Sequence, residues 1–366
     1  MKTERNPKKR LVILFGGRST EHEVSLVSAA GILDKIRRDR YEILPVKITR
    51  DGQWILLDAG SGAGGKLVEQ TAGIPVLPGE PGRGLVRLDN LQAVPVDAVF
   101  PVLHGTFGED GTLQGMLSMA GIPYAGVGVL ASALGMDKIV MKQIFIQNDL
   151  QTVDFIWFLR SRWRGESEAI ARGIRQEIGY PCFVKPANTG SSVGINKAHD
   201  EAELKKFVEE ACAYDRKVLV EKAIDARELE CSVLGNDDPK GSVVGEIIPS
   251  REFYDYDAKY KDENSRAVIP AEIPEDTANR IRYMAVAAFQ AVDCAGYARV
   301  DFLMDRKSGR LYINEINTIP GFTPISMFPK LWEASGLSYP DLIDRLIELA
   351  FERHSDLNQS RFRKRN

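Results

Sequence analysis

Cysteine is scarce in this chain, and its four members stand far apart in the sequence. They are Cys182, Cys212, Cys231 and Cys294. No Cys-x-x-Cys pair occurs, which argues against a zinc knuckle and against a dense disulfide framework. We therefore expect reduced thiols and a cytoplasmic protein.

Long apolar segments and an excess of charge are also missing. No stretch of 18 apolar residues occurs, and the apolar run at 11–15 is too short for a signal peptide. The 48 lysines and arginines nearly balance 51 acidic residues, so the formal net charge is −3. This charge offers no global positive field for nucleic acid. We expect neither a membrane nor a nucleic-acid partner, and any anion site must be local.

Two common nucleotide-binding signatures are absent as well. No Gly-Lys-Ser/Thr sequence ends a Walker A loop, and LFGGRST at 14–20 does not match G-x-G-x-x-G. A P-loop protein and a dinucleotide-dependent dehydrogenase therefore lose support.

The chain that remains has the composition of a folded α/β protein. Its 366 residues, 44% hydrophobic and 27% charged, favour two or three domains. An apolar strand at 11–15, a helix at 23–37 and a strand at 41–48 make a βαβ start, followed by a strand at 96–105 and a helix at 110–121. We read the Gly- and Pro-rich residues 58–87 as a surface excursion or small hairpin. A first domain over 1–128 with a parallel sheet is predicted.

Two further units are expected after residue 128. The second, 129–218, opens with a long helical pattern over 127–148 and contains a strand at 181–187, a Gly/Ser-rich loop at 188–194 and a charged helix at 200–214. The third, 219–366, begins with the strand KVLVEKAI at 217–224 and carries later strands near 228–235, 242–248, 298–304 and 310–317. Its polar and aromatic segment 249–268 is expected to be a mobile lid.

Oxygen-bearing side chains alternate along the last two of these strands. Alternation places Arg299 with Asp301 on one face and Glu315 with Asn317 on one face, roughly 7 Å apart within each pair. If the two faces coincide, the oxygens converge into a site that suits Mg²⁺. The alternative is the wet face of an ordinary strand.

Two groups of residues between these strands and the first domain also invite a functional interpretation. Lys185 precedes the Gly/Ser-rich loop, a pattern that can cradle a phosphate, although most such loops are plain turns. Glu221, Lys222 and Glu228 follow a strand and suit an adenine and a ribose, although a solvated strand end would look the same.

Strand ends in the first domain offer a place for a substrate. Glu21 and His104 each follow a strand, where open α/β sheets bind ligands, and a carboxylate there suits an ammonium group. His104 has an ordinary alternative as a hydrogen-bonded strand-end imidazole. Lys259 and Tyr260 lie in the expected lid, which would exclude water or merely anchor a surface loop.

Taken together, these segments resemble the D-alanine:D-alanine ligases of the ATP-grasp superfamily. The resemblance runs through GGRSTEHEVSLVSA, LHGTFGEDGTLQGMLSMAGIPYAG, MDK, VKPANTGSSVGI, LVEKAI, ELECSVLG, FYDYDAKY, ARVDF and NEINTIPGFTPISMFP. It covers all but 58–87 and the two termini. It implies a three-domain ATP-grasp enzyme with an N-terminal Rossmann-like parallel sheet and with ATP between the second and third units.

The resemblance also implies a role for each matching residue. On the nucleotide side, it assigns phosphates to Lys138 and Lys185, the adenine amino group to Glu221, the adenine hinge to Lys222, Ala223 and Ile224, the ribose to Glu228, and further nucleotide contacts to Lys259 and Asn314. Two Mg²⁺ ions, or Mn²⁺, would be held by Asp301, Glu315 and Asn317, with Glu315 bridging.

On the amino-acid side, the resemblance gives Glu21 the ammonium of the first D-alanine and His104 its carboxylate. The trio Glu21, Ser191 and Tyr260 would hold the lid closed. Arg299 and the Gly321 N–H would form the oxyanion hole, and the second D-alanine's carboxylate would be held by Ser326, Met327 and Lys259.

The implied reaction is ATP-dependent formation of D-alanyl-D-alanine for peptidoglycan precursors through an acyl phosphate, by a homodimer. Tyr260 stands where relatives that use D-lactate carry a histidine, which favours an amine as the second substrate. The alternatives are another ATP-grasp carboxylate-amine ligase, such as one for D-lactate or D-serine, and a catalytically inactive nucleotide-binding relative.

Overall fold

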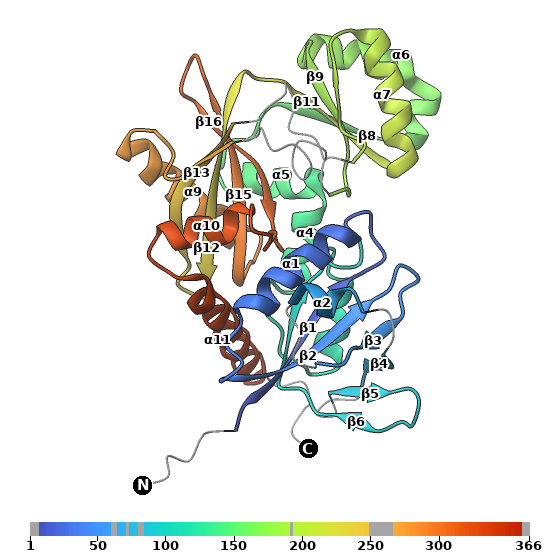
Figure 1. The fold of residues 1–366 in the computed structure, drawn as a ribbon. Coiled ribbons are helices and arrows are strands. Elements are labelled where there is room, and N and C mark those ends of the chain that lie inside the picture. The colour runs from blue at the N-terminus through green and yellow to red at the C-terminus, as the bar shows by residue number, and fades with distance from the viewer. Residues whose placement is uncertain are drawn as a thin grey trace.

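Three β-sheets organise the chain. The computed structural model describes residues 7–59, 64–70, 73–79, 84–190, 193–248 and 266–360. In Figure 1 the first sheet (blue to cyan) lies in the lower part of the molecule and the second (green) at the upper right, with helices α4 and α5 between them and the third sheet (yellow to orange) to the left of the second. Across these described ranges, no helix is both long enough and apolar enough to cross a bilayer.

The first sheet has a parallel centre and an antiparallel edge. Its strand order is β6-β5-β4-β3-β2-β1-β7, and β1 pairs in parallel with both β2 and β7. Its strands are β1 (Lys9–Gly16), β2 (Tyr41–Ile48), β3 (Trp54–Leu56), β4 (Ile74–Pro78), β5 (Leu85–Arg87), β6 (Ala93–Val94) and β7 (Ala98–Val102). Its helices are α1 (His22–Lys35), α2 (Gly64–Val68) and α3 (Thr112–Met119). The βαβ start is confirmed, and the β4–β5 pair shows that part of 58–87 is a hairpin on the sheet edge.

The second sheet is antiparallel, with the order β10-β9-β11-β8. It is built from β8 (Phe155–Leu159), β9 (Cys182–Pro186), β10 (Asn196–Ala198) and β11 (Lys217–Lys222), with helices α6 (Arg160–Glu177) and α7 (Glu201–Tyr214). The sequence prediction placed KVLVEKAI at the start of the third unit. The structure instead pairs β11 with β9 and β8, because Val218 and Val220 lie in the core of the second sheet and Leu219 packs in a small cluster with Ile139 and Ala187.

The third sheet is also antiparallel, with the order β14-β13-β12-β15-β16. Its strands are β12 (Ala226–Gly235), β13 (Lys240–Ile248), β14 (Arg266–Val268), β15 (Gly296–Asp305) and β16 (Leu311–Asn317), and its helices are α9 (Glu275–Ala291), α10 (Met327–Ala334) and α11 (Tyr339–Leu357). The four strands predicted near 228–235, 242–248, 298–304 and 310–317 are confirmed. Of the predicted lid, residues 249–265 lie outside the described residues, and 266–268 form an edge strand where a loop was expected.

One long helix was expected over 127–148, and the structure has two. Helices α4 (Val129–Met136) and α5 (Lys138–Gln147) are separated by Asp137, whose φ of −88° and ψ of 98° are not helical. The Asp137 side chain accepts hydrogen bonds from the backbone N–H groups of Ile139 and Val140 and so caps α5. Met141 and Phe145 of α5 then pack in the core of the third sheet.

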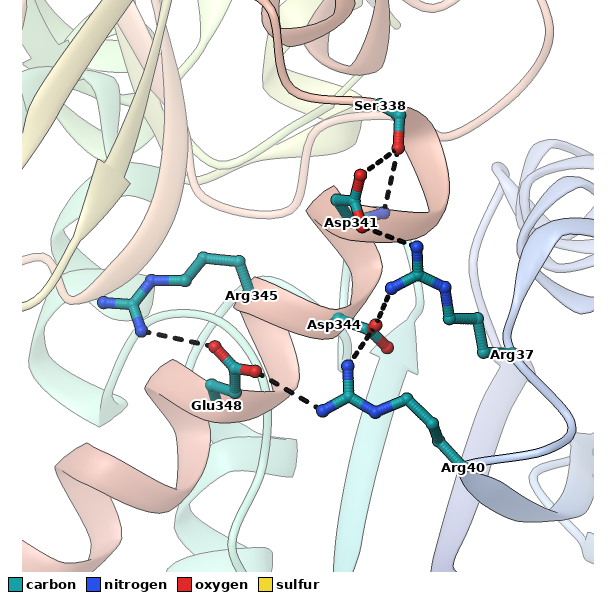
Figure 2. A network of polar contacts seen from close by, with 7 residues as sticks. All are labelled: Arg37, Arg40, Ser338, Asp341, Asp344, Arg345 and Glu348. Atoms are coloured by element: carbon teal, nitrogen blue, oxygen red, sulfur yellow. Dashed lines mark hydrogen bonds and ion pairs between the residues drawn. The ribbon is translucent and has the colours of Figure 1, made fainter.

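The C-terminal helix α11 returns to the first sheet. Leu342, Ile343 and Leu346 of α11 lie in one hydrophobic core with Phe100 of β7. Figure 2 shows the polar edge of this contact, where Asp344 forms ion pairs with Arg37 and Arg40 of the segment between α1 and β2. The first and third sheets are therefore joined by a helix that follows the third sheet in sequence.

All four cysteines lie within the described residues and are buried free thiols, as the spacing predicted. Burial raises the pKa of the Cys182 thiol to about 11 and that of Cys231 to about 12, so both are inert as nucleophiles.

Candidate active site

Residues from distant parts of the chain line one cavity. Its wall is polar and comes from the first-sheet loops, from the start of α5, from the Gly/Ser-rich loop and from the end of the third sheet. The lining residues that carry chemistry are Glu21, His104, Glu109, Lys138, Arg299, Glu315, Asn317, Gly321, Ser326 and Met327. Nine of the residues that the sequence singled out therefore face a common space, whereas Asp301, Lys185 and Glu221 are not among its lining residues.

The two alternating faces of β15 and β16 coincide. Strand register sets Asp301 opposite Glu315 and Arg299 opposite Asn317. Arg299 donates from Nε and Nη2 to the two Asp301 oxygens, at 2.7 and 2.8 Å, and Asn317 Nδ2 donates to Asp301 Oδ2 at 2.9 Å. The Arg299 and Asp301 side chains are only 16% and 14% exposed, so this is not the wet face of a strand.

Glu230 of β12 lies beside Arg299 and Asp301, and the sequence alone did not reveal it. It lies opposite Asp301, and Arg299 Nε is 3.0 Å from Glu230 Oε2. Burial opposes the charge of Arg299, but the carboxylates of Asp301 and Glu230 outweigh it and hold the guanidinium pKa well above its ordinary value. The sequence feature that could have indicated Glu230 is its position as a carboxylate in an otherwise apolar stretch, two residues after Glu228.

The oxygen set at the end of β16 fits a divalent cation. Asn317 uses Nδ2 toward Asp301, which directs its carbonyl oxygen elsewhere, and Glu315 lines the cavity directly. Within the described ranges, no three His, Cys, Asp or Glu side chains form a metal cluster by themselves, so an amide oxygen would have to complete the set. Two carboxylates and one carboxamide are hard ligands of the kind that Mg²⁺ takes together with water and phosphate.

Glu221 is buried, which excludes the solvated strand end as its explanation. Its side chain is 2% exposed, and its two oxygens contact Lys142 Nζ at 2.7 Å and Lys185 Nζ at 2.5 Å. Burial alone would raise the pKa of this carboxyl group, but the two lysines lower it to about 2. By contrast, Lys222 is exposed and Glu228 is half-buried.

The segment after Glu221 is already partly bonded through its backbone. The Lys222 N–H donates to Asp154 O at 3.0 Å, and the Ala223 N–H donates to Pro181 O at 3.2 Å. Ala223 and Ile224 are half-buried. These hydrogen bonds therefore fix the backbone of the connection between the second and third sheets, where an adenine ring is expected to bind.

The Gly/Ser-rich loop approaches the first domain closely. Lys138 Nζ donates to Thr189 O at 2.7 Å, and a Cβ added at Gly190 would lie 2.4 Å from Glu21 Oε2. A side chain at position 190 would therefore displace the Glu21 carboxylate. Ser191, Lys259 and Tyr260 lie outside the described residues, so their assignments stay predictions.

His104 has both ring nitrogens engaged. Nδ1 lies 3.1 Å from Ile319 O and must donate to it, and Nε2 lies 3.2 Å from Ser28 Oγ. Burial lowers the pKa of the imidazole, so His104 is neutral. This is the hydrogen-bonded strand-end imidazole that the sequence left open, and a contact with substrate stays a prediction.

Glu109 is a second site residue that the sequence did not reveal. Its Oε2 accepts the Gly105 N–H at 2.6 Å, and it lines the cavity with Glu21. Burial, followed by the charge of Glu21, raises the pKa of the Glu109 carboxyl group to about 8. Glu109 therefore keeps its proton up to about pH 8 and faces the same cavity as Glu21.

Gly321 and Ser326 meet in the connection between β16 and α10. A Cβ at Gly321 would lie 2.6 Å from Ser326 Oγ, which itself accepts the Thr323 N–H at 3.0 Å. Met327 begins α10 and is buried. Gly321, predicted to stabilise the oxyanion, and Ser326, predicted to bind the carboxylate of the second D-alanine, are therefore neighbours in space.

Comparison with known proteins agrees with this geometry. The family described as D-ala D-ala ligase N-terminus matches residues 10–127, and the family described as D-ala D-ala ligase C-terminus matches residues 144–348. The chain belongs to the D-alanine–D-alanine ligase family. The α/β fold expected from the sequence, an ATP-grasp fold behind a parallel N-terminal sheet, is confirmed with it.

Members of the ligase family from several bacteria are similar over nearly their whole length. The D-alanine–D-alanine ligase of Acetivibrio thermocellus is 49% identical, with 95% of this chain and 97% of that protein covered. The one from Bacillus cytotoxicus is 47% identical, with 97% and 99% covered.

Two solved structures share the fold. The Coxiella burnetii D-alanine-D-alanine ligase has a TM-score of 0.85 at 36% identity, with 96% of each chain covered. The VanG D-Ala:D-Ser ligase of Enterococcus faecalis has a TM-score of 0.84 at 37% identity, with 94% of this chain and 100% of that chain covered.

Proposed function

We propose that this protein joins two D-alanines to D-alanyl-D-alanine, a peptidoglycan precursor, and converts ATP to ADP and phosphate. The observation that carries the proposal is the convergence of Glu21, Arg299, Glu315 and Gly321 on one cavity. An ammonium partner, an oxyanion partner and a cation ligand are then within reach of one substrate. The family membership supports the same reaction.

The chemistry follows from the charge of the first D-alanine. A carboxylate repels nucleophiles and has a poor leaving group, so transfer of the γ-phosphoryl group of ATP makes an acyl phosphate with an activated carbonyl. Lys138 and Lys185 neutralise phosphate charge, and Glu21 holds the ammonium group away from the reacting carboxylate. Asp301, Glu315 and Asn317 would hold Mg²⁺, which would supply charge neutralisation at the phosphates.

The second D-alanine then attacks with its neutral amine. The carbonyl oxygen becomes an oxyanion, which Arg299 and the Gly321 N–H stabilise, and phosphate leaves as the carbonyl re-forms. Arg299 uses Nε and Nη2 toward Asp301, so among its bonds to described residues Nη1 is left for the substrate. The loss of one such donor costs about 2.7 to 4 kcal/mol.

Specificity for the second substrate is tested by competition. We expect D-alanine to be used in preference to D-lactate and D-serine at neutral pH, because Tyr260 stands at the position that carries histidine in the D-lactate relatives. Each candidate is supplied with a fixed amount of D-alanine, and products are identified by mass. Preferred formation of the depsipeptide or of D-alanyl-D-serine would assign the chain to another branch of the family.

The assembly and the compartment are further parts of this proposal. We propose a cytoplasmic homodimer, supported by four buried free cysteines and by the family resemblance. Light scattering of the purified protein should give twice the chain mass of 40.7 kDa. A mass of 40.7 kDa at micromolar concentration would contradict the dimer.

A further inference from the structure

Lys142 is a buried cation to which the mechanism above gives no role. It lies on α5, one helical turn after Lys138, and its side chain is 1% exposed. Its Nζ contacts Glu221 Oε1 of β11 at 2.7 Å and donates to Asn314 O of β16 at 3.1 Å. One ammonium group therefore joins α5 to an inner strand of the second sheet and to the edge of the third.

Glu221 stands between two lysines of different exposure. Lys185 is 11% exposed and precedes the Gly/Ser-rich loop, where phosphates are expected, whereas Lys142 is enclosed by protein. A buried carboxylate that loses its only counter-ion is strongly disfavoured. A carboxylate with two counter-ions can release one of them and stay paired.

We propose that Lys142 is a positioning residue for the nucleotide: it is the permanent counter-ion that aims Glu221 at the adenine amino group and allows Lys185 to move to the phosphates. This inference rests on the proposed function and adds a residue to its nucleotide site. Lys142 acts through Glu221 and does not touch the nucleotide itself.

Two consequences follow if Lys142 is removed. Among the described residues, Lys185 then becomes the sole ion-pair partner of Glu221. Movement of Lys185 to the phosphates would leave the buried Glu221 carboxylate without a counter-ion. The carboxylate also turns toward Lys185, which weakens its selection of an amino group over a carbonyl oxygen at the six-position of the purine. Both nucleotide affinity and preference for ATP over GTP should fall, while D-alanine binding should not change.

The test compares Lys142→Met with the parent and with Lys205→Met, a change to a half-exposed lysine of α7 whose ion pairs lie on the surface. Steady-state rates are measured with ATP and with GTP, and binding of ADP and GDP is measured by calorimetry. For Lys142→Met we expect the KM for ATP to rise about tenfold or more, with a matching fall in the ATP-to-GTP ratio of kcat/KM. The KM for D-alanine should stay unchanged.

A double-mutant comparison separates positioning from a general structural effect and does not need the single variant to fold. Glu221→Gln is compared with Glu221→Gln combined with Lys142→Met, which removes both buried charges together. If Lys142 acts through Glu221, the two proteins agree in ATP-to-GTP ratio within about twofold.

Two results would overturn the inference. One is a Lys142→Met protein that keeps the parental KM for ATP and the parental nucleotide preference. The other is a double variant that loses further preference beyond Glu221→Gln. A parent protein that makes no dipeptide would instead refute the proposed function, so the two failures are distinguishable.

Discussion

At the scale of a single residue, neighbouring charges hold the Arg299 guanidinium group in place. This group lies between Asp301 and Glu230, which prevents it from turning away from the cavity. The placement of Arg299 and Asp301 on one face follows from strand alternation and was predicted from the sequence, but their ion pair was not. The contact with Glu230 was not, because it depends on the register between β12 and β15, about seventy residues apart.

The same distinction applies to Glu109 and Lys142. The Glu109 carboxyl group is influenced by the charge of Glu21, and Lys142 contacts Glu221, so in both cases another segment of the chain supplies the partner. No local spacing encodes such contacts. By contrast, the positions of Glu315 and Asn317 at the end of a strand follow a local pattern, and the sequence alone placed them on one face.

The proposed cation site makes the first prediction. Glu315→Gln should lower kcat by on the order of a hundredfold or more, because a neutral amide cannot balance divalent charge at the phosphates. Dipeptide formation is measured across a Mg²⁺ titration. Glu333→Gln, a change to an exposed residue of α10, serves as the control. Turnover of Glu315→Gln equal to that of the parent would remove Glu315 from the site.

The raised pKa of Glu109 makes a second prediction at this scale. The folded protein holds this proton up to about pH 8, whereas the ordinary glutamate pKa is 4.5. Stability from this group is therefore fully present below pH 4.5 and is lost as pH rises toward 8. Glu109→Gln cannot ionise and should lose less stability over that range. Melting temperatures of both proteins from pH 5 to 8.5 should diverge as pH rises, and parallel curves would show an ordinary pKa.

At the scale of elements, the sequence predicted the positions of most helices and strands. It did not predict where one helix divides into two or which strands pair with β11. The apolar pattern over 127–148 is helical throughout, and only the capping geometry of Asp137 divides it into α4 and α5. The strand β11 was recognised, but its sheet was not, because an apolar strand fits either core. Pairing partners are decided by tertiary packing that a single sequence does not display.

The contact of α11 with the first sheet can be tested through Asp344, which is 5% exposed and shared by two arginines (Figure 2). Asp344→Asn should lower the free energy of unfolding by about 1.5 to 3 kcal/mol, because a buried carboxylate loses its charge-assisted hydrogen bonds to two half-exposed guanidinium groups. Urea unfolding measures the change. Glu348→Gln, at a 47% exposed site that pairs with Arg40, should cost less than about 1 kcal/mol. Equal effects would show that burial of Asp344 does not matter.

For the whole molecule, the three sheets meet around one cavity. Glu21 follows a strand of the first sheet, Lys138 begins α5 before the second sheet, and Glu315 ends the third. The sequence predicted three units and their order, but it could not show that α11 connects the first sheet to the third. Residues near 21 and residues near 320 line the same cavity.

The most direct test of this account is incubation of the purified protein with ATP, Mg²⁺ and D-alanine, followed by mass detection of products. The account predicts D-alanyl-D-alanine, with one ADP and one phosphate formed for each dipeptide. ATP turnover without dipeptide, or no turnover at all with saturating D-alanine, would contradict it.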